Sequence, residues 1–329
     1  MLDGDVLDGA GFDIDELDLD PALEIGADGG DAEGVSVRPV TAEPETDHGD
    51  FRSGFVALFG RPNTGKSTLL NQMLGKKVSI TSDKAQTTRN QIRGIRTTDT
   101  TQIVFVDTPG VGKPRTALGD RLNATAAEAS SGVDLVCFVI DARSGYGKGD
   151  RFLTERLNPA KTVVVLNKCD NLDSARIGAQ LTELAALDAA AYFPVSAMTG
   201  KGVPALVDYL EKAMPSGPHW YPDDHLTDMP EPMWVAELVR EQLLRVTRDE
   251  VPHSVATRVT EWQWPRIRVE ILVERDSQKG IVIGKKGSVL REVGTRARHH
   301  LPDGVYLELF VTVDRNWQHD PERIERLGY

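Results

Sequence analysis

The chain has 329 residues, of which 40% are hydrophobic and 27% charged, so it is long enough for two globular domains and a terminal segment. No apolar run approaches the roughly 20 residues that span a bilayer, and the acidic N-terminus lacks the basic start of a signal peptide. The two cysteines, Cys137 and Cys169, do not indicate a disulfide framework or a metal site. These features favour a protein of the reducing cytoplasm.

The net charge of −12 is unevenly distributed along the chain. Residues 1–50 hold 16 acidic residues and one basic residue, Arg38, which is a net charge of −15. The remaining residues hold 34 acidic and 37 basic residues, a net charge of +3. The acidic composition therefore belongs to the N-terminal segment, and it does not exclude a nucleic-acid partner.

We expect residues 1–51 to form an acidic, disordered tail, because dense like charges repel and repeated aspartates disfavour a strand. Within it, "GFDIDELDLDPALEIG" alternates acidic with apolar residues. An alternative hypothesis is that this stretch is an arm that docks on a partner or on the protein's own basic surface.

A phosphate-binding loop follows the first apolar run. "GFVALF" predicts a buried strand, "GRPNTGKST" comes next, and "LLNQML" has helical spacing. Glycines let the backbone amides of such a loop face phosphate oxygens, its lysine reaches the outer phosphates, and its serine hydroxyl is placed for Mg²⁺. The residues expected to contact the nucleotide are Gly60, Arg61, Pro62, Asn63, Thr64, Gly65, Lys66, Ser67 and Thr68.

A second strand ends in "DTPG", which we interpret as the acidic motif of the same site. Asp107 is expected to hold Mg²⁺ through water, and the backbone amide of Gly110 to bind the γ-phosphate. Thr108 and Pro109 complete the motif and join the expected nucleotide contacts.

Two later motifs indicate guanine as the base. In "VVVLNKCD", the Asp170 carboxylate can accept hydrogen bonds from the N1–H and 2-amino groups of guanine, a donor pair that adenine lacks. Asn167 can brace the phosphate loop, and the Lys168 stem can cover one face of the base. In "FPVSAMTGKG", the backbone amides of Ser196 and Ala197 can meet the guanine O6. The order and spacing of these motifs predict a GTP-binding α/β domain.

The polar loop from Ile80 to Gly94 lies between the two phosphate motifs and has the character of a mobile switch. We expect Thr88 to close over Mg²⁺ together with Ser67 and Asp107, with Thr87 as the alternative. The residues expected to act in catalysis are Lys66, Thr88 and Gly110.

Val111 occupies the position after Gly110, where GTPases of the Ras type carry a water-orienting glutamine. Valine cannot hydrogen-bond to water, so either another group holds the water and turnover is slow, or a cation or partner completes the site. Asn63 is a candidate ligand for K⁺.

The stretch "GRPNTGKSTLLNQMLGKKVSITSDKAQTTRNQIRGI", followed by "DTPG", "NKCD" and "SAMTGKG", resembles the Era family of bacterial GTPases, with "AQTTR" as the most specific part. The resemblance covers roughly residues 54–329. It implies an α/β P-loop GTPase domain, with a mostly parallel sheet flanked by helices, followed by an α+β type II KH domain. The long acidic tail departs from the family pattern.

The second half of the chain fits that organisation. We place the GTPase domain at residues 52–216, a proline-rich linker at 217–232 and the KH domain at 233–329. Helical and alternating patterns predict the order α-β-β-α-α-β. The first helix is expected in "WVAELVREQLLRVT", and the last strand in "VYLELFVTV".

"GIVIGKKGSVL" could be taken for a second nucleotide loop, but its glycine spacing is one residue short and no hydroxyl residue follows its lysine. As a GxxG turn between two helices it lets an RNA backbone come close while lysines meet the phosphates. The expected RNA contacts are Gly284, Lys285, Lys286, Gly287, Lys279 and Arg291. We expect Ile281, Val282 and Ile283 to be core residues.

The family resemblance implies a Mg²⁺-dependent hydrolysis of GTP to GDP and binding to 16S ribosomal RNA near its 3′ end during assembly of the 30S subunit. We expect a cytoplasmic monomer that does not bind DNA and whose GTP state controls RNA engagement. A passive RNA-binding module with a structural nucleotide is one alternative. A regulator attached peripherally to the inner face of the cell membrane is another, although the chain shows neither a lipidation motif nor a strongly amphipathic basic helix.

Overall fold

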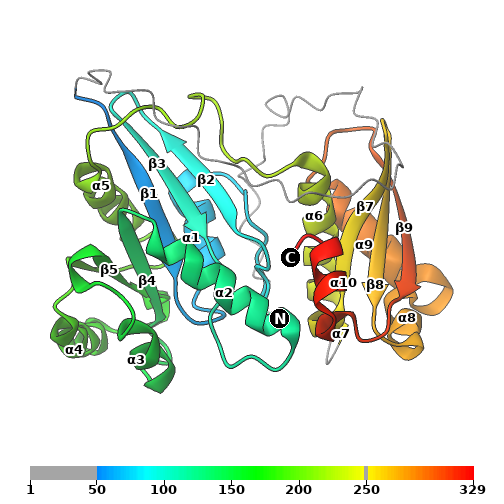
Figure 1. The fold of residues 1–329 in the computed structure, drawn as a ribbon, viewed down its shortest axis with the longest axis horizontal. Coiled ribbons are helices and arrows are strands. Elements are labelled where there is room, and N and C mark those ends of the chain that lie inside the picture. The colour runs from blue at the N-terminus through cyan, green and yellow to red at the C-terminus, as the bar shows by residue number, and fades with distance from the viewer. Residues whose placement is uncertain (1–49, 248–250) are drawn as a thin grey trace.

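The computed structural model of the protein describes residues 50–247 and 251–329, which form two bodies lying side by side (Figure 1). The first body is built on a six-stranded sheet and the second on a three-stranded sheet. This arrangement confirms the predicted fold class, an α/β domain followed by an α+β domain. The predicted disorder of the acidic tail concerns residues of which 1–49 lie outside those described.

The sheet of the first body has the strand order β2-β3-β1-β4-β5-β6. Neighbouring strands are parallel, except that β2 runs antiparallel to β3. The central strands are nearly continuous apolar runs, as expected where helices cover both faces of a sheet. The strands are β1 (Arg52–Phe59), β2 (Ile92–Thr97), β3 (Thr101–Asp107), β4 (Leu135–Asp141), β5 (Thr162–Asn167) and β6 (Ala191–Pro194).

Helices α1 (Lys66–Leu74) and α5 (Val203–Ala213) pack on one face of this sheet. Helices α2 (Ala117–Ser131), α3 (Lys148–Thr154) and α4 (Ser174–Leu184) pack on the other face. Short 3₁₀ turns are η2 (Pro159–Lys161), η3 (Cys169–Asn171) and η4 (Ala185–Leu187).

The register of the parallel strands gathers the sequence motifs at one edge. Leu58 of β1 pairs with Asp107 of β3, and Asp141 of β4 pairs with Asn167 of β5. The loops that follow these residues therefore meet at the carboxyl ends of the strands, where ligands bind in open α/β sheets.

The segment that we expect to be the linker follows the outer sheet edge. The Ile95 amide donates to the Leu226 carbonyl over 2.8 Å, and the Thr227 hydroxyl donates to the Arg93 carbonyl over 2.7 Å. Helix α6 (Glu231–Val246) begins two residues before the expected start of the second domain. The last two residues assigned to the linker are therefore helical.

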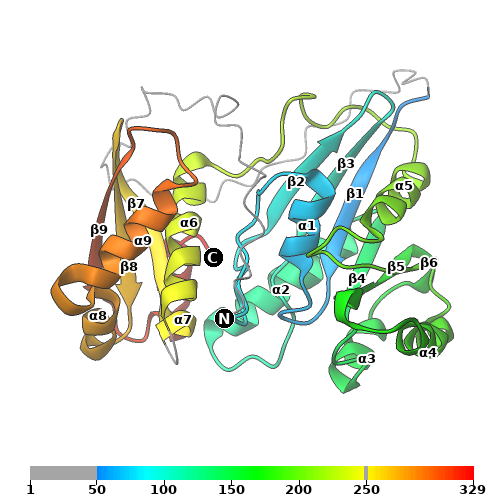
Figure 2. The ribbon, with the colours of Figure 1, turned by 180° about the vertical axis from the view of Figure 1, so that it is seen from behind.

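In the second body, β7 pairs antiparallel with β8, and β8 pairs parallel with β9. Helices α6, α8 and α9 share a core with this sheet (Figure 2). The elements after α6 are α7 (Val251–Ser254), β7 (Ala256–Gln263), β8 (Arg266–Val273), α8 (Asp276–Ile283), η5 (Lys285–Gly287), α9 (Ser288–Arg298), β9 (Tyr306–Val313), η6 (Trp317–His319) and α10 (Pro321–Arg326). The predicted order is confirmed, with α7, η6 and α10 as additions.

The two bodies share apolar contacts. Leu118 and Leu122 of α2 pack in one cluster with Trp317 and Tyr329 from the C-terminal segment. Ile80, the first residue of the switch loop of the first body, is fully buried in the core of the second. Across the described ranges, no helix is both long and apolar enough to cross a membrane.

Candidate nucleotide site and its contact with the second body

The loop between β1 and α1 depends on two glycines. Gly60 has φ 147° and Gly65 has φ 93°, a region that residues with a side chain rarely adopt. A Cβ atom on Gly60 would lie 2.5 Å from the Val139 carbonyl oxygen, and one on Gly65 would lie 2.4 Å from Asn167 Nδ2. Only glycine fits at either position, so the predicted curl of this loop is present.

Lys66 lies inside the loop. Its Nζ donates to the Gly60 carbonyl over 3.1 Å and to the Arg61 carbonyl over 3.0 Å. Burial lowers the pKa of Lys66 to about 8, although the Asp107 charge opposes that change. A buried cation held only by neutral carbonyls is well suited to receive a phosphate, whose charge would favour the ammonium form.

Three hydroxyl groups donate hydrogen bonds to the Asp107 carboxylate. Its Oδ2 accepts hydrogen bonds from Ser67 over 2.7 Å, from Ser79 over 3.0 Å and from Thr88 over 3.5 Å. Its Oδ1 is buried without a hydrogen-bond partner in the described part of the chain. Burial raises the pKa of Asp107 despite these bonds and the charge of Lys66. A buried carboxylate with an unused oxygen and adjacent hydroxyls fits a hard divalent cation such as Mg²⁺.

The structure separates the two threonines of the switch loop. Thr88 Oγ1 lies 2.8 Å from Ser67 Oγ, at the Asp107 cluster. Thr87 Oγ1 instead lies 2.7 Å from Ser82 Oγ and donates to the Lys84 carbonyl. Of the two candidates, only Thr88 reaches the hydroxyl cluster. A space of about 50 Å³ remains between this loop and the phosphate loop.

The base-recognition motifs meet as predicted. Asn167 Nδ2 donates to the Thr64 carbonyl over 2.8 Å, while its Oδ1 accepts from the Ala197 amide over 2.9 Å. Asn167 thus links the phosphate loop to the "SA" loop. Asp170 Oδ1 accepts from the Ser196 hydroxyl over 2.9 Å, and the Asp170 side chain is exposed. The carboxylate is therefore exposed and held beside the "SA" loop.

Asp141 is a site residue that the motifs did not predict. Its Oδ2 binds Lys168 Nζ at 2.9 Å and Arg143 Nη2 at 2.9 Å. Burial alone would raise its pKa, but hydrogen bonds from Arg143 and Lys168 lower the pKa to about 2. Lys168 also donates to the Asn63 carbonyl, so Asp141 fixes a lysine that touches the phosphate loop.

The remaining residues of the first two motifs lie close together. The Thr108 hydroxyl donates to the Leu58 carbonyl over 2.7 Å, and a Cβ on Gly110 would lie 2.5 Å from Pro62 Cα. Arg61 forms an ion pair with buried Asp150 at 3.2 Å and does not face the loop interior. The other members of the expected set, Thr68 and Pro109, lie in the first turn of α1 and directly after Thr108.

The GxxG stretch forms a tight turn between α8 and α9. Gly284, Lys286 and Gly287 have φ values of 72°, 54° and 75°. Lys285, Lys286 and Arg291 are exposed, while Lys279 is half-buried. The turn therefore presents an unpaired basic surface, since no ion pair engages these four residues in the described ranges.

The prediction that Ile281, Val282 and Ile283 are all core residues is wrong for one of them. Val282 is fully buried and Ile283 packs partly against the core, but the Ile281 side chain is 52% exposed. One turn of a surface helix cannot bury three consecutive residues on one side. Ile281 is therefore an exposed apolar side chain beside the GxxG turn.

Helix α6 of the second body forms hydrogen bonds with the start of the switch loop and with the residues just before it. Glu241, buried on α6, accepts from Lys77 Nζ over 2.6 Å and from the Thr81 amide over 2.9 Å. Sequence reasoning missed these contacts, since they join groups 160 residues or more apart.

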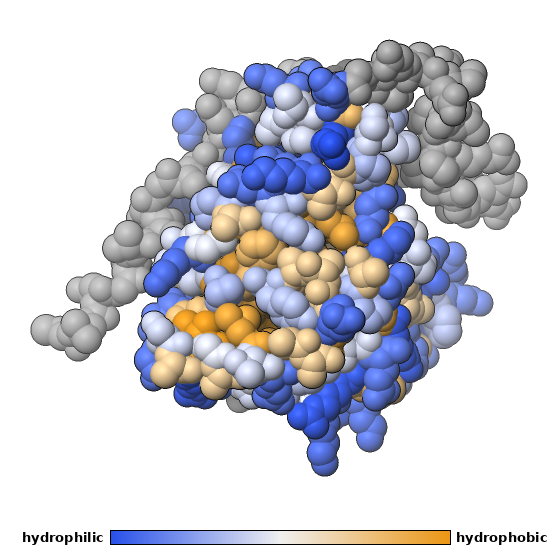
Figure 3. Space-filling model, turned by 90° about the vertical axis from the view of Figure 1, so that its left-hand side faces the viewer, coloured by the Kyte–Doolittle hydropathy of each residue, from blue (hydrophilic) through white to orange (hydrophobic). Residues whose placement is uncertain are grey.

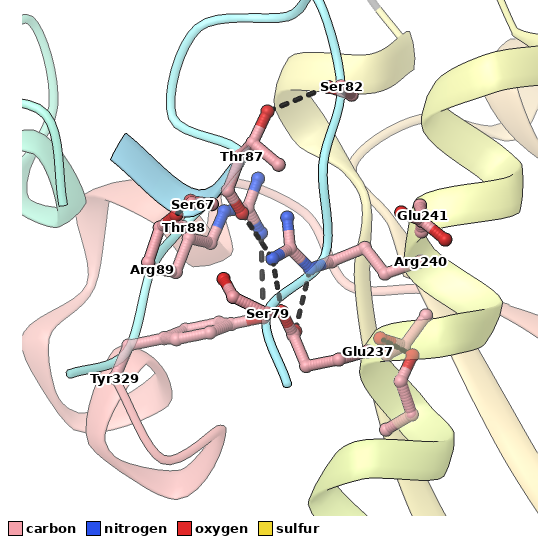
Figure 4. Close-up of polar contacts among 12 residues, drawn as sticks. Ser67, Ser79, Ser82, Thr87, Thr88, Arg89, Glu237, Arg240, Glu241 and Tyr329 are labelled. Carbon is pink, nitrogen blue, oxygen red and sulfur yellow. Dashed lines mark hydrogen bonds and ion pairs between the residues drawn. The ribbon is translucent and has the colours of Figure 1, made fainter. Parts of the chain in front are cut away.

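Further along the loop, Arg240 of α6 donates to the Thr87 carbonyl and binds the Glu237 carboxylate at 2.8 and 2.5 Å (Figure 4). Arg89 is also buried, donates to the Val255 carbonyl over 2.7 Å and has its guanidinium 5.4 Å from the Tyr329 ring. These contacts, together with those of Glu241, are named the switch-loop interface below. They flank Thr88, so the second body is bonded on both sides of the candidate Mg²⁺ ligand.

The phosphate loop, the DTPG motif and the guanine-selective motif of a GTPase thus lie at one sheet edge, joined to a KH fold with its GxxG turn. A family model described as "50S ribosome-binding GTPase" matches residues 55–168, and a KH domain model matches residues 250–318. The GTPase Era of Mycobacterium tuberculosis strain H37Rv is 49% identical over 299 residues, covering 85% of this chain and 99% of that protein. The GTPase Era of Mycobacterium avium strain 104 is 48% identical over 298 residues, with the same coverage. The chain belongs to the Era family of GTPases.

Two solved structures agree with this assignment. Era in complex with MgGDPNP and nucleotides 1506–1542 of 16S ribosomal RNA matches with a TM-score of 0.81 and 36% identity. A variant of Aquifex aeolicus Era bound to GDP·AlF4⁻ matches with the same score and identity. Each match covers 85% of this chain and 99% of the other. The family confirms the predicted GTPase activity and the use of a guanine nucleotide with Mg²⁺.

Proposed function

We propose that this GTPase binds the 3′ region of 16S ribosomal RNA through its KH domain during assembly of the 30S subunit, and that its nucleotide state controls the engagement of RNA. The relative solved with a 16S fragment supports the partner. The observation that carries the control is the switch-loop interface. Thr88 faces the hydroxyl cluster of Asp107, while the carbonyl of the adjacent Thr87 is bonded to Arg240 of the KH domain. This shared loop is the route by which we expect a change at one site to alter the other.

The geometry supports individual roles for the site residues. We propose that the Lys66 ammonium and the Gly110 amide bind the γ-phosphate, and that Ser67, Thr88 and Asp107 hold Mg²⁺. Bound Mg²⁺ would neutralise developing charge on the phosphates. Asp170 would select guanine, with the other expected contacts lining the nucleotide.

The GxxG lysines supply the direct test of RNA binding. Replacing Lys285 and Lys286 by aspartate should weaken binding of a 16S 3′-end RNA by roughly 100-fold or more, since two phosphate contacts become repulsions. Arg176→Asp with Lys212→Asp changes the net charge equally on exposed positions of the GTPase domain and should leave the affinity nearly unchanged. Fluorescence anisotropy at fixed salt measures both, with GTP affinity as the folding control. An unchanged RNA affinity in the GxxG variant would show that the clamp lies elsewhere.

The lowered pKa of Lys66 predicts proton uptake on nucleotide binding. Above about pH 8 the free protein has largely released this proton, and a phosphate beside Lys66 would raise the pKa and take the proton back. GTP affinity should therefore fall as the pH rises through about 8. Calorimetry in two buffers of different ionisation enthalpy should detect uptake at about pH 8.5 and almost none near pH 7. Equal proton exchange at both pH values would contradict this assignment.

We propose K⁺ as an additional cofactor at Asn63. This residue has φ 61°, and its Nδ2 donates to the Asp83 carbonyl of the switch loop over 2.9 Å, so an amide oxygen and loop carbonyls lie near the phosphate site. Such a cation would complete the site in place of the water-orienting glutamine, whose position Val111 occupies. GTP hydrolysis should be faster in K⁺ than in Na⁺ buffer, and Asn63→Asp should change this preference. Equal rates of GTP hydrolysis in the K⁺ and Na⁺ buffers would contradict the proposal.

We propose that the protein is a cytoplasmic monomer that does not bind DNA. Any association with the membrane would be peripheral and on the inner face of the cell membrane. The passive alternative, in which the nucleotide is structural, differs in one observable. In a switch, the GTP and GDP forms must differ in RNA affinity, whereas a passive module binds RNA equally in both forms.

A further inference from the structure

A groove of about 1130 Å³ lies over the GTPase sheet between α2 and α3, next to the nucleotide site, with which it shares Arg61 and Pro62 of the phosphate loop. Phe59 and Val136 of the sheet form part of its floor, with Phe152, Leu153 and Leu157 on the α3 side. Phe152 is 52% exposed, which is unusual for so large an apolar side chain. On the side of the GTPase domain that carries α3 and α4, apolar side chains gather among hydrophilic ones (Figure 3). The groove is thus an apolar surface without a described partner.

The groove is bordered by cations. Its lining residues include no Asp or Glu, but five basic residues: Arg61, Lys113, Lys148, Arg156 and Lys161. Arg61 is paired with Asp150, whereas the other four form no ion pair in the described ranges. The Arg156 guanidinium lies 4.2 Å from the centre of the Phe152 ring. An apolar floor with an unneutralised basic rim fits an occupant that is both apolar and acidic.

We propose that residues 12–25 of this chain, within the acidic N-terminal segment, bind this groove. Phe12–Asp15 and Leu17–Asp20 each alternate apolar and acidic residues, so within either stretch an extended backbone would turn apolar side chains to the floor and carboxylates to the rim. Glu16 shifts the alternation by one residue, so both stretches fit together only with an irregular residue in the backbone at that point. Residues 12–25 contain six acidic and no basic residues. This complementarity of charge and pattern is the first observation that identifies the occupant.

The place where this segment joins the GTPase domain is the second observation that identifies the occupant. The GTPase domain begins at β1, where the Asp134 amide donates to the Phe55 carbonyl over 3.0 Å and Asp134 Oδ2 accepts from the Phe55 amide over 2.8 Å. Val133, the preceding residue, lines the groove. Residues 26–51 could span roughly 80 Å when extended. That reach far exceeds the roughly 23 Å of a seven-residue strand such as β4. The segment can therefore reach the groove of its own molecule.

Binding there would bear on the nucleotide site. Pro62, Val111 and Gly112 also line the groove, and the Val111 amide donates to the Gly60 carbonyl of the phosphate loop over 3.2 Å. An occupied groove therefore restrains the residues that directly follow the DTPG motif. This inference does not depend on the RNA partner, so the two proposals fail separately.

Photocrosslinking in the full-length chain tests the proposal. Phe12 is replaced by benzoylphenylalanine, and crosslinks are mapped by mass spectrometry in a mixture of light and heavy isotope-labelled protein. We expect crosslinks within one molecule to peptides from residues 111–161. Lys148→Glu with Arg156→Glu should reduce their yield at least tenfold, while Arg176→Glu with Lys212→Glu should not. Raising the salt from 0.05 to 0.5 M should lower the yield in the unmodified background, because salt screens exposed charges.

Three results would overturn it. Crosslinks to residues 275–300 would place the segment on the basic KH surface instead. Crosslinks between light and heavy chains alone would make the occupant a second molecule. A yield that responds neither to the rim substitutions nor to salt would remove the charge complementarity on which the proposal rests. Unchanged GTP affinity in the rim variant shows that its nucleotide domain is folded, and the salt series tests the proposal without any substitution at the rim.

Discussion

Arg240→Met is expected to lower the free energy of unfolding by about 3–5 kcal/mol, because it leaves the Glu237 carboxylate buried without its cation. Arg240 has 0% exposure and forms two bonds to Glu237 and one to the Thr87 carbonyl. Scanning calorimetry should show a loss of roughly 10 °C in melting temperature. The same variant should reduce the difference between GTP and GDP in RNA affinity, since the switch loop loses its bond to α6.

Two further variants distinguish the effect of the unpaired Glu237 charge from the effect of the lost bond to the Thr87 carbonyl. Glu237→Gln with Arg240→Met removes the unpaired charge and should recover much of the stability without restoring the bond to Thr87. Arg245→Met removes an ion pair of the same helix whose arginine is 43% exposed, and should cost less than about 1 kcal/mol. If Arg240→Met melts like the unmodified protein, or if its RNA affinity keeps the full nucleotide dependence, the switch-loop interface does not couple the domains.

Asp170→Asn is expected to weaken GTP binding by roughly 100-fold to 10,000-fold, because two charge-assisted hydrogen bonds to guanine are lost at about 1.5–3 kcal/mol each. Binding of xanthosine triphosphate should strengthen, since an amide can donate to the 2-oxygen that replaces the 2-amino group. Asn should be tolerated structurally, because Asp170 is exposed and the Ser196 hydroxyl can reverse its role from donor to acceptor.

Competition between the two nucleotides with a fluorescent analogue measures the change of preference. Asp173→Asn is the matched control, because Asp173 caps α4 three residues away and asparagine caps a helix equally well. It removes the same charge nearby and should leave the base preference intact. A guanine preference that survives Asp170→Asn would refute the assignment of this carboxylate.

The sequence was sufficient for features that depend on neighbouring residues. The Gly60–Thr68 loop lies between a strand and a helix, the DTPG motif ends a strand, and the GxxG turn joins two helices. Each depends on elements adjacent in the chain, and each is present. The choice between Thr87 and Thr88 needed three dimensions, because the loop has no periodicity and the two hydroxyls point to different partners.

Other site features depend on contacts between distant segments. Asp141 lies on β4 and Lys168 follows β5, so their ion pair follows from strand register and from no motif. Arg89 and Arg240 meet the opposite domain, and only the placement of the two bodies reveals them. Ile281 was misassigned because an apolar run in a short helix does not show which side faces the core.

The burial of Ile80 in the core of the KH domain has a practical meaning for dividing the molecule. A fragment that starts at the linker would lose Ile80 and Lys77 from its own interior. Its α6 would keep Glu241, a carboxylate that is buried in the intact protein, with Arg245 as its remaining basic partner. The stretch of sequence that forms the KH domain therefore does not include every residue of its packed core, because Ile80 comes from the GTPase domain. RNA binding by an isolated KH fragment would report on a domain with an incomplete core, and comparison within the full chain is the sounder measurement.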